Sequence, residues 1–159
     1  MSADTSPLTP GALAPDFDLP RDGGERVALT HFSGRPVIVF FYPKDDTPAC
    51  TNEAISFSAL SDQFAALNAV LIGISADNVK SHDKFIKKHN LNVILGADEE
   101  KSVLEAYGVW KEKSMYGKTY MGIERTTFLI DGNGKIARIW EKVKVAGHAE
   151  DVLAAVKAL

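Results

Sequence analysis

The chain is poor in cysteine: Cys50 is the only one among its 159 residues. A single thiol cannot form a disulfide within the chain, so nothing calls for an oxidising compartment. An excess of one charge is also missing, because 18 basic residues are set against 21 acidic ones and the net charge is −3. Without a large basic field, we expect neither nucleic acid nor an anionic membrane as a partner.

Apolar runs long enough to span a bilayer are absent as well: the longest, such as 37–42, are far too short. The residues at the start lack the basic and apolar regions of a secretory signal, which leads us to expect a cytoplasmic protein. The hydrophobic fraction of 45% and the charged fraction of 25% are those of an ordinary globular protein. We expect a flexible N-terminal segment over residues 1–13 and a single domain over 14–159.

Two apolar segments, 36–43 and 70–74, run without polar alternation, which is typical of strands buried on both faces. The residues between them include a set at helical spacing: Phe57, Leu60, Phe64 and Leu67. Strand, helix and strand at this separation predict a βαβ unit with a right-handed crossover.

The rest of the chain continues the alternation of extended and helical patterns. Extended pieces are expected over 14–19, 25–29, 91–95, 126–130 and 136–140, and helices over 79–88, 99–107 and 149–159. A turn rich in glycine and asparagine at 131–135 predicts that the last two strands form a hairpin. Lys111, Lys113 and Lys118 fall in an expected polar loop before Arg125, with docking of a reductant as the alternative to a merely solvated loop. The pattern as a whole predicts an α/β fold, with a central mixed β-sheet flanked by helices on both faces.

The most informative segment is 43–53, which begins where a buried strand ends and finishes where a helix starts. Ligands bind at this edge of open α/β sheets, and the free N–H groups of a first helical turn stabilise a thiolate. At about 100° per residue, Cys50 falls within roughly 20° of Phe57 on the inward stripe, whereas Ile55 lies about 160° from that stripe. Cys50 should therefore lie at the bottom of a small pocket.

Plainer interpretations exist for each of these residues. A lone cysteine is usually a small buried hydrophobic residue, Thr47 suits a turn or a helix cap, and Pro48 suits a helix start. Asp45 and Asp46 are expected to be solvated loop carboxylates. The four histidines lack the spacing of metal ligands, so we expect surface or core histidines and no metal: His31, His82, His89 and His148.

Longer matches decide between these interpretations. Pro43, Thr47 and Cys50 fit the Pro-x-x-x-Thr-x-x-Cys signature of peroxiredoxins. The runs 41–48, 115–118 and 122–129 resemble the bacterioferritin comigratory protein (PrxQ) branch of that family. The likeness extends from about residue 14 to the C-terminus.

The resemblance implies a thioredoxin-like fold and a peroxidase without a cofactor, acting on hydrogen peroxide and organic hydroperoxides. Cys50 would be the peroxidatic thiolate, which attacks one peroxide oxygen and becomes a sulfenic acid. Thr47 would hydrogen-bond the thiolate and the substrate, and Arg125 would favour the thiolate and hold the peroxide. Pro43 belongs to the same pocket, and Pro48 would shield the sulfur from water.

Magnitudes limit what thiolate formation alone can achieve. For any thiol, lowering the pKa from ~8.5 to ~6 raises the thiolate fraction at neutral pH about 30-fold, while nucleophilicity falls roughly 10-fold. Donors that stabilise charge on the leaving oxygen must therefore supply most of the rate. Glu53 is expected in the first helical turn, where a carboxylate suits the helix dipole and can bridge to Arg125.

The chain also departs from its relatives. Many relatives carry a resolving cysteine where this chain has Ile55, and others in the helix that here contains 85–87; neither is present. An external thiol (thioredoxin, glutaredoxin or glutathione) must reduce the sulfenic acid, unless Cys50 of a second copy does so. A chain in which the resolving cysteine had been replaced by engineering would have this same sequence. We expect a monomer, with a homodimer as the alternative.

Two other functions remain open at this point. A thioredoxin-type reductant would use Cys-x-x-Cys, but Thr47 stands in the place of the first cysteine. A non-catalytic redox sensor or chaperone-like protein would use the same sulfenic acid chemistry. Turnover in excess thiol separates an enzyme from a sensor, because a sensor stops after one equivalent of peroxide.

Overall fold

The computed structural model describes residues 8–159, so part of the N-terminal segment expected to be flexible lies outside the described residues. Within that segment, the Gly11 amide donates to the Ile136 carbonyl at 2.8 Å, and the Ile136 amide donates to the Ala12 carbonyl at 2.8 Å. These bonds join residues 11–12 to the start of strand β9 (Ile136–Trp140). The domain boundary expected at residue 14 stays a prediction.

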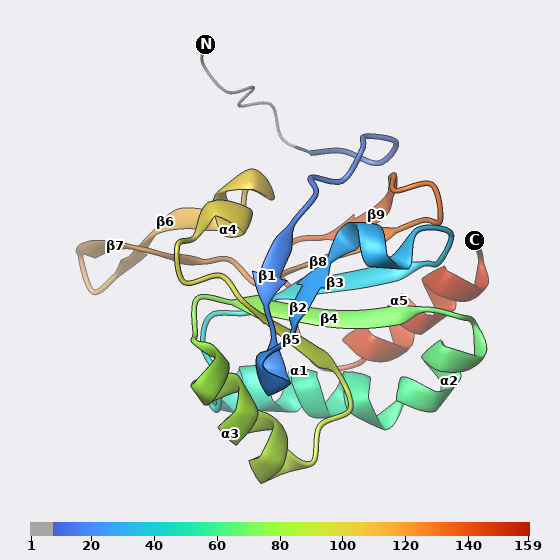
Figure 1. Cartoon of the computed structure of the whole chain (residues 1–159). Coiled ribbons are helices and arrows are strands. Elements are labelled where there is room, and N and C mark those ends of the chain that lie inside the picture. The colour runs from blue at the N-terminus through green and yellow to red at the C-terminus, as the bar shows by residue number, and fades with distance from the viewer. Residues whose placement is uncertain (1–7) are drawn as a thin grey trace.

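A five-stranded sheet forms the centre of the molecule, in the order β5-β4-β3-β8-β9 (Figure 1). Its other strands are β3 (Val37–Phe41), β4 (Val70–Ser75), β5 (Ile94–Ala97) and β8 (Thr126–Ile130). β3, β4 and β5 are parallel, whereas β8 pairs antiparallel with both β3 and β9. The expected mixed sheet is confirmed.

Every residue of β3 and β4 is buried, as the uninterrupted apolar runs predict. Gly73 lies within β4 beside the ring of Phe40, and a Cβ at that position would come within 2.7 Å of the ring. The Phe40 ring stacks on Phe57 at a centroid distance of 4.7 Å. The glycine therefore lets an aromatic ring lie against the sheet and support the helix above it.

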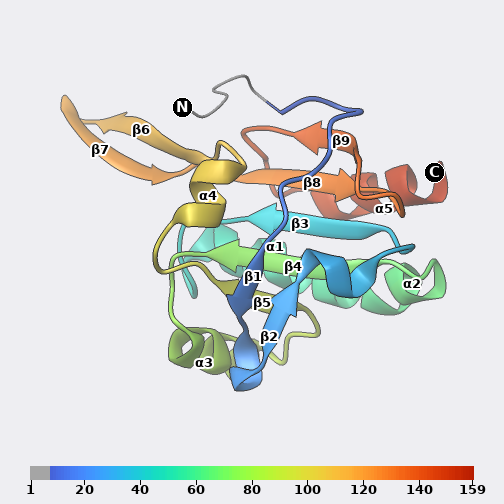
Figure 2. The ribbon, with the colours of Figure 1, turned by 45° about the horizontal axis from the view of Figure 1, so that its top comes forward.

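Helices cover both faces of the sheet unequally (Figure 2). One face carries α1 (Pro48–Ala59), α2 (Ser61–Ala66), α3 (Val79–His89) and α5 (His148–Lys157). The other face is covered by α4 (Ser102–Ala106) and by a small hairpin of β1 (Asp18–Pro20) and β2 (Arg26–Ala28). Short 3₁₀ turns at Asp22–Gly24 and Leu29–Phe32 flank β2. Within residues 8–159, no helix has the length and apolar character needed to cross a bilayer.

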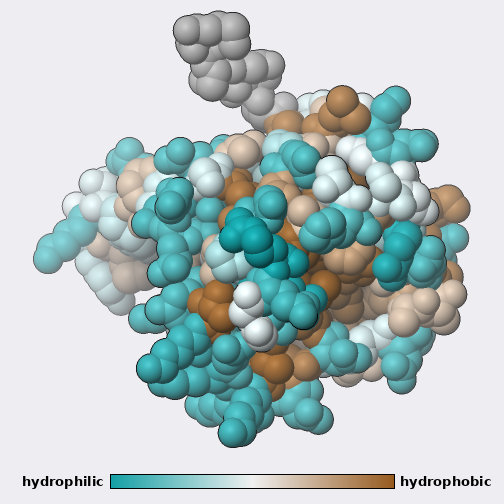
Figure 3. Space-filling view, viewed as in Figure 1, coloured by the Kyte–Doolittle hydropathy of each residue, from teal (hydrophilic) through white to brown (hydrophobic). Residues whose placement is uncertain are grey.

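The expectation of a polar loop around Lys111, Lys113 and Lys118 is wrong. The segment forms a two-stranded hairpin of β6 (Trp110–Met115) and β7 (Lys118–Ile123), which projects from the body in Figures 1 and 3. Its turn at Tyr116 and Gly117 has φ of 54° and 77°, which suits the right-handed twist of a tight hairpin. Most hairpin side chains are exposed, so the sequence lacks the apolar alternation that marks a strand covered on one face.

Candidate active site

Cys50 lies at the start of α1, on the side of the helix that faces the core. Thr47 is the N-cap residue and Pro48 is the first residue of the helix, which places Cys50 in the first turn at the carboxyl end of β3. Its exposed fraction is 2%, and Phe57 on the same stripe is fully buried, whereas Ile55 is 42% exposed. The inward placement predicted from helical geometry is confirmed.

Arg125 connects the sulfur to a carboxylate. It lies between β7 and β8, with Nη2 3.2 Å from Cys50 Sγ and Nη1 2.8 Å from Glu53 Oε1. Its side chain is only 13% exposed. Burial alone would lower the pKa of Arg125, but the charge of Glu53 and the contact with Cys50 outweigh that effect and raise it. The guanidinium is therefore a fixed positive charge beside the thiol.

Glu53 forms the expected bridge to Arg125, but it does not lie in the first turn of α1 as expected. It follows Cys50 by one turn and is 1% exposed. Burial raises the pKa of Glu53 to about 7, although the charge and hydrogen bond of Arg125 oppose that rise. Its Oε2 is buried and has no hydrogen-bond partner within the described part of the chain. The helix dipole is therefore not what holds this carboxylate; its ion pair with Arg125 is.

The Thr47 hydroxyl donates to the Lys44 carbonyl at 2.8 Å, and its side chain makes no capping bond. A hydroxyl has one proton, so Thr47 does not donate to the thiolate in this arrangement, contrary to our expectation. Its oxygen lone pairs stay available as acceptors. Pro48 occupies the helix start, where a missing N–H costs nothing, and both Pro43 and Pro48 are exposed.

Our interpretation of Asp45 as a solvated carboxylate is wrong. Asp45 is 7% exposed, and its carboxylate accepts hydrogen bonds from the hydroxyls of Tyr42 at 2.6 Å and Ser81 at 2.8 Å. His82 Nδ1 lies 2.7 Å from the same carboxylate. Asp46 is exposed, as expected. A signal for this buried cluster was present: His82 precedes Phe85 by three residues, which places both on the inward stripe of α3.

The sequence also led us to expect histidines that are ordinary surface or core residues, and His148 is a core residue of this kind. His148 is buried and lies with Nε2 2.9 Å from the Thr127 hydroxyl, and burial lowers the pKa of His148 to about 4. Across residues 8–159, no cluster of histidine, cysteine and carboxylate side chains has the arrangement of a metal site.

Comparison with known proteins gives a consistent result. The sequence profile of the AhpC/TSA family matches residues 10–139. Peroxiredoxin Bcp of Bacillus subtilis is 48% identical over 147 residues, which are 92% of this chain and 94% of that protein. Peroxiredoxin Bcp of Escherichia coli is 43% identical over 148 residues, 93% of this chain and 95% of that one.

Solved structures of similar proteins have the same fold as this chain. Peroxiredoxin Q of Xanthomonas campestris superposes with a TM-score of 0.88 at 44% identity, covering 95% of this chain and 96% of that one. A PrxQ mutant of Xylella fastidiosa gives a TM-score of 0.91 at 38% identity, covering 96% and 98%. The mixed sheet with its flanking helices is thus the thioredoxin-like fold of these enzymes. The chain belongs to the AhpC/TSA family, in its Bcp (PrxQ) peroxiredoxin branch, and is a thiol-dependent peroxidase.

Proposed function

We propose that Cys50 is the nucleophile of this peroxidase, and that Arg125 and Thr47 bind the peroxide against it. The observation that carries the proposal is the bridge of Arg125 between the sulfur, at 3.2 Å, and Glu53, at 2.8 Å. A guanidinium held at both ends stabilises the thiolate and keeps N–H groups aimed at the place where an oxygen approaches that sulfur.

The reaction is a displacement at oxygen. The Cys50 thiolate attacks one oxygen of the hydroperoxide, an S–O bond forms as the O–O bond breaks, and the other oxygen leaves as hydroxide or alkoxide and takes up a proton. The cysteine becomes a sulfenic acid. In the transition state, negative charge moves from the sulfur to the leaving oxygen. The positive charge of Arg125 lies close enough to stabilise it on both atoms.

Thr47 complements the cationic side of the pocket. Its only hydroxyl proton goes to the Lys44 carbonyl, so its oxygen presents lone pairs. A hydroperoxide has an O–H group that can donate a hydrogen bond to those lone pairs. We assign Thr47 to orienting that proton, while Pro43 and Pro48 form the rim of the pocket and keep water from the sulfur.

Recycling requires an external thiol, because Cys50 is the only cysteine of the chain. The incoming thiol displaces the sulfenic hydroxyl as water, and a second thiol then cleaves the mixed disulfide. Thioredoxin, glutaredoxin with glutathione, and glutathione alone are the reductants we propose, with the protein acting as a monomer in the cytoplasm. A reducing compartment is where such thiols are available.

A steady-state assay tests this cycle. Wild type and Cys50→Ser are supplied with hydrogen peroxide or an organic hydroperoxide and with thioredoxin, glutaredoxin plus glutathione, or dithiothreitol in turn. We expect many turnovers by wild type with at least one reductant and none by Cys50→Ser. Consumption of a single equivalent of peroxide with every reductant would instead identify a sensor.

A further inference from the structure

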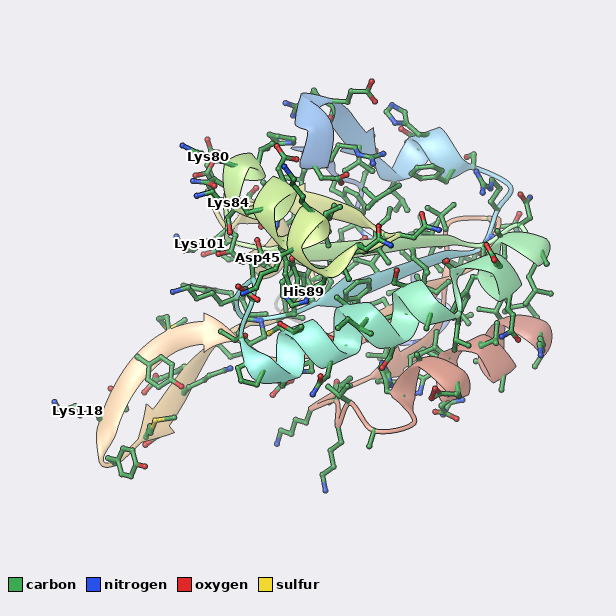
Figure 4. All side chains as sticks on the ribbon, turned by 90° about the horizontal axis from the view of Figure 1, so that it is seen from below. Asp45, Lys80, Lys84, His89, Lys101 and Lys118 are labelled. Carbon is green, nitrogen blue, oxygen red and sulfur yellow. The ribbon has the colours of Figure 1, made fainter. Side chains whose placement is uncertain are left out.

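A second polar cluster lies behind the active-site loop and contacts no reacting atom. Its centre is the pair of Asp45 and His82, with Oδ2 and Nδ1 2.7 Å apart and with side chains 3% and 0% exposed. Figure 4 labels Asp45, which lies between helix α3 and the first turn of helix α1. Buried ionisable groups are costly unless paired, so such a pair requires an explanation.

The hydrogen bonds define the protonation of the pair. His82 Nδ1 faces the Asp45 carboxylate, and Nε2 faces the Gly96 carbonyl of β5 at 3.0 Å. A carbonyl oxygen only accepts, so Nε2 donates to Gly96; opposite an ionised Asp45, which also only accepts, Nδ1 donates as well. A neutral imidazole has one N–H and would leave a lone pair against an oxygen. The geometry therefore fits an imidazolium paired with a carboxylate.

The surroundings of His82 support the charged form. From β3, the Tyr42 hydroxyl lies 3.4 Å from Nδ1, and Ser81 on α3 donates to Asp45. Asp77, between β4 and α3, adds a second negative charge. Burial by itself would lower the pKa of His82, but the hydrogen bond and charge of Asp45 outweigh it, and the net shift is upward.

The nearby cations are separated from the ring. Lys84, Lys87 and Lys88 of α3 are exposed and line a hollow with Asp45 and Phe85 on the solvent side of the cluster. No cation contacts the His82 ring among the described residues.

The loop between β3 and α1 is fastened to α3 through this cluster. The backbone amide of Asp45 donates to Asp77 Oδ2 at 2.8 Å, and Ser75 donates to the same oxygen at 2.7 Å. The next residue, Asp46, has φ of 59° and contacts Lys88 at 2.6 Å and His89 at 2.8 Å. Each residue of the dipeptide 45–46 is therefore held by α3.

The active-site residues follow this fastened dipeptide directly. Thr47 is the next residue, and its hydroxyl is bonded back to Lys44 on the other side of Asp45. Cys50 is the third residue of α1, which begins at Pro48, two residues after Asp46. A shift of Asp45 would therefore move both Thr47 and the first turn of α1.

We propose that Asp45 and His82 form a buried carboxylate–imidazolium pair that positions the loop carrying Thr47 and Cys50, so that peroxide reduction depends on the charge of a histidine that touches no reacting atom. Both are positioning residues. Loss of the His82 proton leaves the Asp45 charge buried opposite a ring lone pair, and the loop must move to rehydrate it. A misplacement of about 1 Å at a reacting group costs on the order of 100-fold in rate.

The experiment compares wild type, His82→Gln and Asp45→Asn, with His31→Gln as the matched histidine replacement at an exposed position in the Leu29–Phe32 turn. The rate constant for peroxide reduction and the rate of iodoacetamide alkylation are each measured across pH. We expect a wild-type peroxide rate that falls above the ordinary histidine pKa of about 6.5, while alkylation does not fall. His82→Gln should lack that falling limb, with a peroxide rate about 10- to 100-fold lower and near-normal alkylation. His31→Gln should keep the limb.

A peroxide rate of His82→Gln equal to wild type would overturn the proposal, as would equal losses in both rates, which indicate general damage to the fold. If the variant does not fold, nitrogen NMR of the His82 ring in wild type decides. Two protonated ring nitrogens at neutral pH support the proposal, and a neutral ring overturns it. The inference rests on the proposed role of Cys50, but the NMR result does not depend on activity, so the two can fail separately.

Discussion

The terminal nitrogen Nη2 of Arg125 lies 3.2 Å from the sulfur of Cys50, although 75 residues separate the two in the chain. Nη1 of the same guanidinium is occupied by Glu53. The cation is therefore oriented by a buried carboxylate as well as by its contact with the thiol. This arrangement allows the two roles that we propose for Arg125 to be tested separately: stabilising the thiolate and holding the peroxide.

Arg125→Ala should separate these functions experimentally. We expect its peroxide rate to fall by about 100-fold or more, because a donor aimed at developing charge is lost. The thiolate fraction should fall only a few-fold, because the N-terminus of α1 still favours the anion. Stopped-flow peroxide oxidation and pH-titrated alkylation measure the two quantities. Equal losses in both would contradict this division.

Arg125→Lys is the matched control. Lysine keeps the positive charge but not the planar fork that reaches sulfur and carboxylate together. We expect alkylation close to wild type and a peroxide rate that stays well below it.

The sheet was predictable from the sequence, and the hairpin was not. β3 and β4 are buried on both faces, so their apolar runs reveal them directly. β6 and β7 pair with each other away from the central sheet, and Tyr116 at their turn is 95% exposed. A hairpin with little buried surface leaves no periodic signal, and only its turn residues could have indicated it.

Some features of the active site were likewise predictable from the sequence and others were not. The inward position of Cys50 followed from helical geometry, whereas the contact with Arg125 came from the resemblance alone. The burial of Asp45 was missed because a charged residue in a loop is usually solvated. Its burial depends on His82, 37 residues away, and a contact of that range cannot be deduced from local pattern.

Introducing a second cysteine should change the fate of the sulfenic acid. Wild type has no partner sulfur, so excess peroxide should convert Cys50 to sulfinic acid readily. Ile55→Cys places an exposed thiol on the opposite side of α1, where disulfide formation requires the helix to unwind locally. We expect this variant to form an intramolecular disulfide and to accumulate several-fold less sulfinic acid.

Mass spectrometry after graded peroxide distinguishes the products, since the sulfinic acid adds two oxygens and the disulfide removes two hydrogens. Ile55→Ser is the matched control, because it makes the same surface polar without adding a thiol. Resistance of wild type to sulfinic acid at high peroxide would count against the prediction.

Thr47 offers a test of substrate orientation. Thr47→Val keeps the shape but removes the hydroxyl, and Thr47→Ser keeps the hydroxyl. We expect a peroxide rate about 10- to 100-fold below wild type for valine and within a few-fold for serine. Similar rates for both variants would show that the Thr47 oxygen does not act on the peroxide. The rate of alkylation serves as the control for damage to Cys50 itself.

The stability of the protein should contain two opposing dependences on pH. The pKa of Glu53 rises from 4.5 to about 7 on folding, chiefly through burial. Between pH 4.5 and 7 the folded state holds a proton on Glu53 that the unfolded state has lost. Glu53 therefore makes the free energy of unfolding fall as pH rises, by about 3 kcal/mol in total.

His148 acts in the opposite direction. The pKa of His148 falls from 6.5 to about 4, also through burial. Here the unfolded state holds the extra proton, so His148 makes the free energy of unfolding rise with pH.

The two contributions overlap between pH 4.5 and 6.5, where they offset each other in wild type. Glu53→Gln removes the falling contribution, so its free energy of unfolding relative to wild type should rise with pH across this range. His148→Gln should show the opposite slope, and the double variant should run nearly parallel to wild type. Urea unfolding at several pH values measures each difference, in which the contributions of all other groups cancel. Single-variant profiles that run parallel to wild type would mean that neither group titrates abnormally in the fold.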